Sequence, residues 1–139
     1  MRGLERASLS RWRMELTTAP SGAVVLNDAY NANPTSVAAA LESLVALPAR
    51  RRIAVLGVMA ELGDRSAADH AAIGARAREL GIEVLAVAAP EYGGRDVATI
   101  DEALATLADL GDGDAVLVKG SRVAGLERLA DALLDREPR

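Results

Sequence analysis

The sequence contains no cysteine, which excludes disulfide bonds, thiol catalysis and cysteine-ligated metal. A zinc site or a Ser-His-Asp arrangement would have to use the one histidine of the sequence, His70, for which we expect a structural or surface role. The glycine-rich dinucleotide and phosphate-loop motifs are absent, because Lys119 precedes its glycine instead of following it. The chain is therefore not expected to carry a metal site or a phosphate loop of its own.

Aromatic residues are also scarce, since Trp12, Tyr30 and Tyr92 are the only ones and phenylalanine is absent. Half of the residues are nevertheless hydrophobic, so the core must be built from Val, Leu, Ile and Ala. Such a composition is typical of helices packed on a buried sheet. No apolar run is long enough for a membrane span and the N-terminus lacks a signal-peptide pattern, so a cytoplasmic domain is expected.

Clustered positive charge is lacking as well. The formal net charge is −4, which argues against binding to nucleic acid or an anionic membrane. The one basic run, residues 50–52, lies between an expected helix and an expected strand, and we interpret it as a solvated loop. Partners of small size are therefore favoured over polyanions.

The pattern of apolar residues predicts one α/β domain over residues 11–139, with residues 1–10 as a linker or terminal edge. Alternation in 11–16, with Trp12, Met14 and Leu16 on the inner face, predicts a half-buried strand. A turn at 20–22 then makes this strand one arm of a β-hairpin. Further strands are expected at 23–27, 53–56, 84–87, near 97 and at 115–118.

Helices are expected between these strands. The first begins at Pro34 with Asn33 as N-cap, and the second has Ser66 as N-cap and ends before Gly81. The third starts at Asp101, with Leu104, Leu107 and Ala108 directed inward, and the fourth spans 121–135. This alternation predicts a Rossmann-like, mostly parallel sheet with helices on both sides, opened by an antiparallel hairpin. Ligands would then bind beyond the carboxyl ends of the strands.

Two loops at such strand ends have unusual compositions. All of the asparagines, Asn27, Asn31 and Asn33, fall in one short span. Lys119 is the single lysine among the 16 lysine and arginine residues, and it lies at the end of an expected strand. A compact ammonium serves some sites better than a planar guanidinium does. These two loops are therefore the candidate functional loops.

Four motifs resemble the C-terminal domain of the Mur ligase family, specifically its MurF branch. They are Asp28-Ala29-Tyr30-Asn31-Ala32-Asn33-Pro34, the run from Leu56 to Gly63, Ser66 with His70 and Ile73-Gly74, and Val118-Lys119-Gly120-Ser121-Arg122. Arg13-Met14-Glu15 is similar to the arginine-bearing strand that opens the family's domain. The resemblance covers nearly all of residues 11–134.

The resemblance implies a fragment of an ATP-dependent ligase. Such ligases activate a carboxylate as an acyl phosphate, which an amine attacks to give an amide, ADP and phosphate. In the MurF branch the acceptor is a UDP-N-acetylmuramoyl tripeptide and the amine is D-alanyl-D-alanine. The phosphate loop and the magnesium ligands belong to a central domain, and neither motif occurs in this chain. The chain alone is therefore expected to be inactive, and a monomer is expected.

The same resemblance implies the site residues. Nucleotide contacts would come from Arg13, Asp28 and Asn31, and contacts to D-alanyl-D-alanine would come from Lys119, Ser121 and Arg122, at the start of the last expected helix. Further candidates are Glu61, Tyr30 and Asn33, although an N-cap is the stronger interpretation of Asn33. Glu61 would orient the amine or pair with a basic neighbour, and these two roles stay open.

Two alternatives from other classes remain. The chain could be a stand-alone α/β module that binds a nucleotide or a small anion without catalysis. It could also be a structural or regulatory domain that contacts only a partner protein. A reading frame that continues upstream into a domain with a phosphate loop would favour the ligase.

Overall fold

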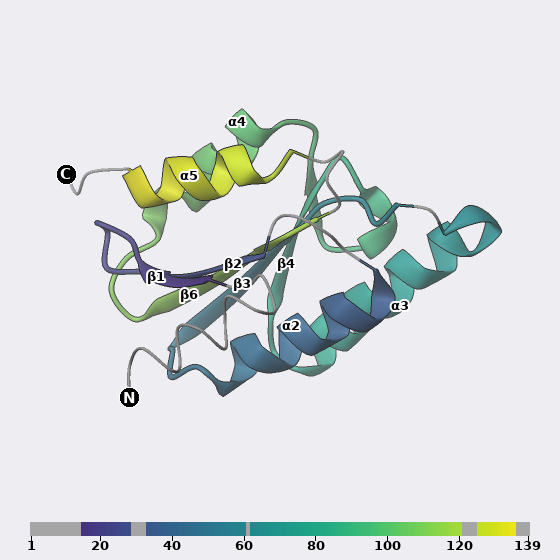
Figure 1. Cartoon of the computed structure of the whole chain (residues 1–139), viewed down its shortest axis with the longest axis horizontal. Coiled ribbons are helices and arrows are strands. Elements are labelled where there is room, and N and C mark those ends of the chain that lie inside the picture. Colours follow the sequence, from purple (N-terminus) through teal and green to yellow (C-terminus); the bar gives the residue numbers. More distant parts are fainter. Residues whose placement is uncertain (1–14, 29–32, 61, 121–124, 136–139) are drawn as a thin grey trace.

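A computed structural model describes residues 15–28, 33–60, 62–120 and 125–135 of the chain. Within this part, one six-stranded sheet lies between two layers of helices (Figure 1). The strand order is β1-β2-β6-β3-β4-β5, and only the β1–β2 pair is antiparallel. The strands are β1 (Glu15–Thr18), β2 (Val24–Asp28), β3 (Arg51–Leu56), β4 (Glu83–Val87), β5 (Arg95–Val97) and β6 (Asp114–Lys119).

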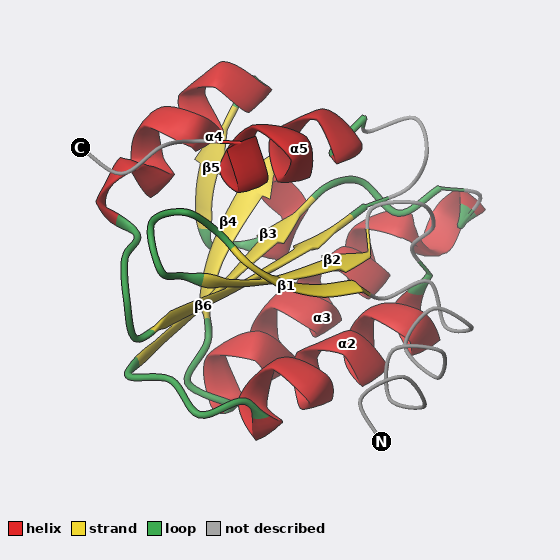
Figure 2. Cartoon of the chain, turned by 60° about the vertical axis from the view of Figure 1, so that its left-hand side comes forward, coloured by secondary structure: helices red, strands yellow, loops and turns green. Residues whose placement is uncertain are grey.

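The helices divide between the two faces of the sheet, as Figure 2 shows. They are α2 (Pro34–Ala46), α3 (Ser66–Glu79), α4 (Ile100–Thr106) and α5 (Glu127–Asp135), with short 3-10 turns η1 (Gly63–Arg65), η2 (Pro90–Tyr92) and η3 (Leu107–Asp109). Helices α2 and α3 cover one face, and α4 and α5 cover the other. The expected Rossmann-like architecture is thus confirmed.

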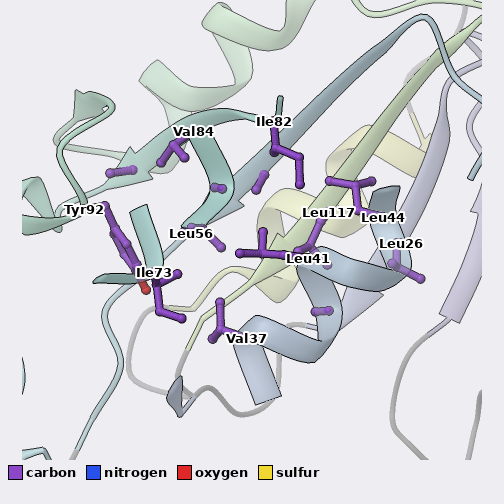
Figure 3. Close-up of a cluster of buried hydrophobic side chains, with 14 of the residues drawn as sticks. Leu26, Val37, Leu41, Leu44, Leu56, Ile73, Ile82, Val84, Tyr92 and Leu117 are labelled. Atoms are coloured by element: carbon purple, nitrogen blue, oxygen red, sulfur yellow. The ribbon is translucent and has the colours of Figure 1, made fainter. Parts of the chain in front are cut away.

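The core consists of two clusters, one on each face of the sheet. The cluster under α2 and α3 contains Leu41, Leu44, Leu56, Leu117 and Tyr92 (Figure 3). The opposite cluster is built almost wholly from Val, Leu, Ile and Ala, as the composition predicts. Burial of a Leu or Val side chain stabilises a fold by roughly 1.5–3 kcal/mol, so two such clusters explain how a chain with few aromatics folds.

Several local predictions are confirmed. Asn33 caps α2, because its side chain accepts a hydrogen bond from the Ser36 N–H at 2.9 Å. Ser36 Oγ accepts from the Asn33 N–H at 3.1 Å, which completes a reciprocal capping box. Gly81 closes α3 with a φ of 77°, a left-handed conformation that glycine adopts without strain.

Other predictions are wrong at element ends. Ser66 is the first residue of α3 and not its N-cap, because η1 leads directly into the helix and Ser66 already has helical dihedrals. The single helix expected over 121–135 is not continuous, since Gly125 has a φ of 68° that no right-handed helix accommodates; α5 spans Glu127–Asp135, and residues 121–124 lie outside the described part of the chain. Leu16 is 44% exposed because β1 is an edge strand, and Ala108 is exposed because η3 replaces the last helical turn.

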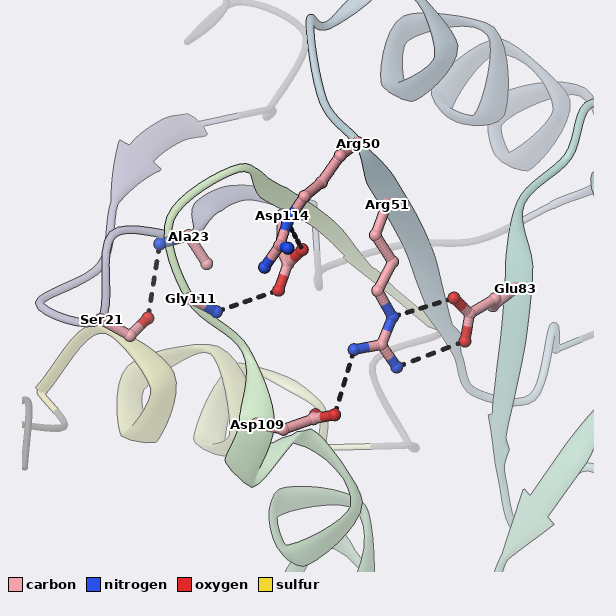
Figure 4. A network of polar contacts seen from close by, with 8 residues as sticks. All are labelled: Ser21, Ala23, Arg50, Arg51, Glu83, Asp109, Gly111 and Asp114. Carbon is pink, nitrogen blue, oxygen red and sulfur yellow. Dashed lines mark hydrogen bonds and ion pairs between the residues drawn. The ribbon is translucent and has the colours of Figure 1, made fainter.

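The basic run at residues 50–52 is not a solvated loop. Arg51 and Arg52 belong to β3, and Arg51 pairs with Glu83 at 2.9 Å and with Asp109 at 3.2 Å (Figure 4). Arg50 pairs with Asp114 at 3.3 Å. These contacts close the amino-terminal edge of the sheet, opposite the carboxyl ends of the parallel strands.

Candidate functional site

The carboxyl ends of three neighbouring strands form the candidate site. Strand register places Asp28 of β2 opposite Lys119 of β6, and Lys119 opposite Leu56 of β3. All three strands are parallel, so the loops that follow them leave the sheet at the same edge. Ligands of open α/β sheets bind at this edge.

An ion pair joins two of these strand ends. Lys119 Nζ donates a hydrogen bond to Asp28 Oδ2, and the residues are only 1% and 6% exposed. Register puts both side chains on the α2–α3 face, because Leu26 and Leu117, two residues earlier on each strand, belong to the core cluster there. A buried charge pair is costly to form, since both groups lose their hydration. Such a pair is therefore weak evidence for net stability.

The loop after β3 is held by three hydrogen bonds from separate elements. The Gly57 N–H donates to the Lys119 carbonyl at 3.0 Å, which extends the β3–β6 pairing by one residue. The Tyr92 hydroxyl donates to the Gly57 carbonyl at 2.7 Å. The Met59 N–H donates to His70 Nε2 at 2.9 Å. Residues 57–59 are thus tied to β6, η2 and α3.

His70 is a buried connector, since it is 1% exposed and both ring nitrogens have partners. Because Nε2 accepts from Met59, the proton lies on Nδ1, which faces the Ser66 carbonyl at 2.6 Å. The ring meets Tyr92 edge-on, with centroids 4.8 Å apart. Burial also raises the pKa of the Tyr92 hydroxyl well above its ordinary value, so the hydroxyl keeps its proton and remains a donor.

The structure brings together two of the residues that the sequence predicts for the site, Asp28 and Lys119. Asn33 lies at the start of α2 and serves as its cap, as the stronger interpretation had it. Six other predicted residues lie outside the described part of the chain: Arg13, Tyr30, Asn31, Glu61, Ser121 and Arg122. The helix start expected beside Lys119 also lies outside the described residues, and the described helix α5 begins at Glu127.

Sequence patterns miss one feature of this edge. The linkage of His70 to Met59 and of Tyr92 to Gly57 has only a weak signal, namely one histidine one turn before Gly74 on a buried helix face. Asn27, which the composition singles out with Asn31 and Asn33, has a buried Oδ1 without a hydrogen-bond partner in the described part of the chain. Most buried polar atoms are paired, so this acceptor, which alternation along β2 places on the opposite face from Asp28, is notable.

Metal and membrane features are absent from the part of the chain that the structure describes. No group of three or more acidic or histidine side chains gathers there in a way that would hold a metal ion. Across residues 15–28, 33–60, 62–120 and 125–135, the helices are too short or too polar for a membrane crossing.

A mostly parallel sheet with helices on both faces places the chain in the class of Rossmann-like α/β domains, in which ligands bind at the carboxyl edge of the sheet. Comparison with known families narrows this class, since the family model described as "Mur ligase, glutamate ligase domain" matches residues 12–122. The chain therefore belongs to the Mur ligase C-terminal domain family.

Relatives of known identity agree on one branch of that family. The UDP-N-acetylmuramoyl-tripeptide–D-alanyl-D-alanine ligase of Mycobacterium tuberculosis is 39% identical, over 91% of this chain and 31% of its own length. The ligase of the same name from Escherichia coli is 36% identical, over 79% of this chain and 26% of its own. The chain thus spans about a third of the length of the curated relatives that it matches.

Solved structures agree with the same branch. MurF from Acinetobacter baumannii superimposes with a TM-score of 0.81 at 30% identity, covering 97% of this chain and 32% of the other. MurF from Thermotoga maritima, solved in complex with ADP, gives a TM-score of 0.77 at 28% identity, covering 87% of this chain and 30% of the other.

Proposed function

We propose that this chain is the C-terminal domain of a cytoplasmic, ATP-dependent ligase that joins D-alanyl-D-alanine to a UDP-N-acetylmuramoyl tripeptide. The observation that carries the proposal is the buried Asp28–Lys119 pair at the carboxyl edge of the sheet. It joins two of the motifs by which the sequence resembles the family. The 39% identity to ligases of this specificity supports the choice of substrates.

Asp28 is proposed to contact the nucleotide. A carboxylate accepts hydrogen bonds from the two hydroxyls of a ribose, and Lys119 fixes the direction of this carboxylate by binding Oδ2. Arg13 and Asn31 are proposed to add polar contacts to the same nucleotide. The relative from Thermotoga maritima was solved with ADP, which supports a nucleotide in this family.

The amine substrate is proposed to bind beside Lys119. Its carboxylate would meet Ser121 and Arg122, and Lys119 would contribute positive charge while it remains paired with Asp28. Glu61 would orient the attacking amine, and Tyr30 and Asn33 would complete the rim. Helix α5 starts at Glu127, and the intervening residues 121–124 lie outside the described part of the chain.

The domain would act by positioning. Well-oriented reactants gain roughly 7–11 kcal/mol of barrier reduction, and closure over ATP would exclude the water that hydrolyses an acyl phosphate. Magnesium is proposed to be held by a central domain, as the family resemblance implies. The complete ligase is proposed to be a monomer.

The test is ADP release by the complete ligase that contains this chain. We expect release that requires ATP, the tripeptide and D-alanyl-D-alanine together, with little release when L-alanyl-L-alanine replaces the dipeptide. The 139-residue chain alone serves as the control and should release none. ADP release that ignores the dipeptide would refute the substrate assignment.

A titration of the isotopically labelled chain separates the ligase from a stand-alone binding module. For a ligase domain, amide shifts induced by ATP or the dipeptide should be weak and should gather around Asp28 and Lys119. Saturating shifts far from this edge, for example at residues 50–52 on the opposite edge of the sheet, would favour the binding module.

A further inference from the structure

We propose that His70 and Tyr92 are positioning residues for the amine substrate, because they fix the loop after β3 against the end of β6. Neither residue is among the predicted contacts to nucleotide or dipeptide. The inference rests on the proposed function, which supplies the identity of the amine substrate. We call the two hydrogen bonds that join His70 and Tyr92 to the loop the brace. We call residues 57–60 the β3 loop.

The β3 loop has no secondary structure of its own, so its shape depends on what holds it. Tyr92 fixes the carbonyl of Gly57, and His70 fixes the N–H of Met59. The two contacts are to adjacent peptide groups of the chain, and the side chains of His70 and Tyr92 are fully or almost fully buried. The first half of the loop is thereby held by side chains whose burial keeps them in place.

The two supports are fixed relative to each other. Gly74 lies one turn beyond His70 on α3, and a Cβ at this position would lie 1.8 Å from the Tyr92 carbonyl oxygen. Only glycine allows α3 to approach η2 so closely. Arg78 Nη1 also donates to the Tyr92 carbonyl at 3.3 Å, from the next turn of the helix. Helix α3 and η2 therefore form one rigid support for the loop.

Histidine suits this position for a specific chemical reason. This position needs an acceptor toward the Met59 N–H and a donor toward the Ser66 carbonyl. Both must belong to a flat ring that meets Tyr92 edge-on. Neutral imidazole with its proton on Nδ1 supplies all three. Phenylalanine would supply only the ring, whereas glutamine would supply an acceptor and a donor without the ring.

The β3 loop connects directly to the candidate site. The Gly57 N–H binds the carbonyl of Lys119, so the loop is joined through its backbone to the residue proposed to lie beside the dipeptide. Glu61, proposed to orient the amine, follows the loop in the chain. The nucleotide contact at Asp28 lies on β2, on the other side of β6. Loss of the brace should therefore weaken dipeptide use more than ATP use.

The kinetic test compares three variants of the complete ligase. We expect His70→Phe to raise the KM for D-alanyl-D-alanine by about tenfold or more, because a displacement of about 1 Å in a positioning contact costs up to ~100-fold. The KM for ATP should change by less than about twofold. His70→Gln should recover most of the loss. Ile73→Val, on the same buried face of α3 but without a hydrogen bond to the loop, is the matched control and should leave both constants unchanged.

A second measurement does not depend on turnover. Nitrogen NMR of the 139-residue chain should show His70 as the neutral tautomer with its proton on Nδ1. Tyr92→Phe, which removes one hydroxyl and keeps the ring, should shift the amide signals of Val58 and Met59. A proton on Nε2, or amide signals that are unchanged in the Tyr92→Phe variant, would contradict the brace even if a His70 variant failed to fold.

The outcomes separate this inference from the proposed function. If wild-type ligase shows no dipeptide-dependent ADP release, the proposed function fails and the choice of substrate fails with it. If wild-type ligase is active and His70→Phe behaves like Ile73→Val, only the positioning role is overturned. Equal increases in both KM values would also overturn it, because they indicate a general loss of structure.

Discussion

Removal of one charge from the buried pair tests the candidate site most directly. Lys119→Met keeps most of the side-chain volume but deletes the ammonium that binds Asp28. The Asp28 carboxylate would then remain in a position that is 6% exposed, without this partner charge. Breaking a buried pair in this way typically costs about 3–5 kcal/mol. Domains of this size are usually stable by about 5–15 kcal/mol, so the variant should fold with a much smaller margin.

Urea unfolding of the 139-residue chain, followed by far-UV circular dichroism, measures this cost. A loss of about 4 kcal/mol with a slope of about 2 kcal/mol per molar urea lowers the midpoint by about 2 M. Arg76→Met is the matched control, because the Arg76–Glu42 pair is solvent-exposed, with a 2.7 Å contact. Exposed pairs contribute about 0.2–1 kcal/mol, so this control should hardly move the midpoint.

A double-mutant cycle completes the experiment. Asp28→Leu combined with Lys119→Met removes both charges, and replacement of a buried pair by apolar groups is often close to neutral. The double variant should therefore be more stable than Lys119→Met alone. A loss below about 1 kcal/mol for Lys119→Met, with no recovery in the double variant, would show that the two groups are solvated and that the buried pair does not form.

The remaining predictions concern Asn33, which caps α2, the contact of Gly74 with η2, and the Tyr92 hydroxyl. Asn33→Ala should cost about 1 kcal/mol in urea unfolding, through loss of the bond from the Ser36 N–H; Ser43→Ala, in the middle of α2, should cost less. Gly74→Ala should destabilise the chain by about 2 kcal/mol or more despite its better helix propensity, because its Cβ would overlap the Tyr92 carbonyl; a wild-type melting temperature would contradict the close contact. The raised pKa of Tyr92 means that above pH ~10 the unfolded chain releases this proton first, so stability should fall with rising pH by up to about 1.4 kcal/mol per unit. Tyr92→Phe should flatten that alkaline slope, and an unchanged slope would assign it to other groups.

Local signals in the sequence were sufficient to predict the architecture. Period-two and helical patterns gave each strand and helix of the described chain to within a few residues, apart from the late start of α5. The Asn33-Pro34 pair predicted the start of α2, because N-cap and first-turn preferences depend only on neighbouring residues. The parallel order then placed Asp28 and Lys119 at one edge of the sheet.

Contacts between distant residues account for the errors. Arg51 looks like part of a charged loop until Glu83 and Asp109, 32 and 58 residues away, are seen beside it. Helix α5 starts late because the left-handed Gly125 interrupts an otherwise helical pattern. Asp28 and Lys119 are 91 residues apart, so their mutual pairing is visible only in the folded chain. The family resemblance implied both as ligand contacts without linking them.

The pairing of these two residues bears on how such a domain could work. A free carboxylate and a free ammonium would each lose hydration when a ligand arrives, which costs binding energy. In this chain Asp28 and Lys119 are already desolvated against each other, and the adjacent β3 loop is already held by Tyr92 and His70. Much of the free-energy cost of desolvating these charges and ordering the loop is thus incurred during folding, before a ligand binds. Under the proposed function, binding energy from closure onto ATP would then be available to position the amine, which is where a preorganised domain would increase the rate.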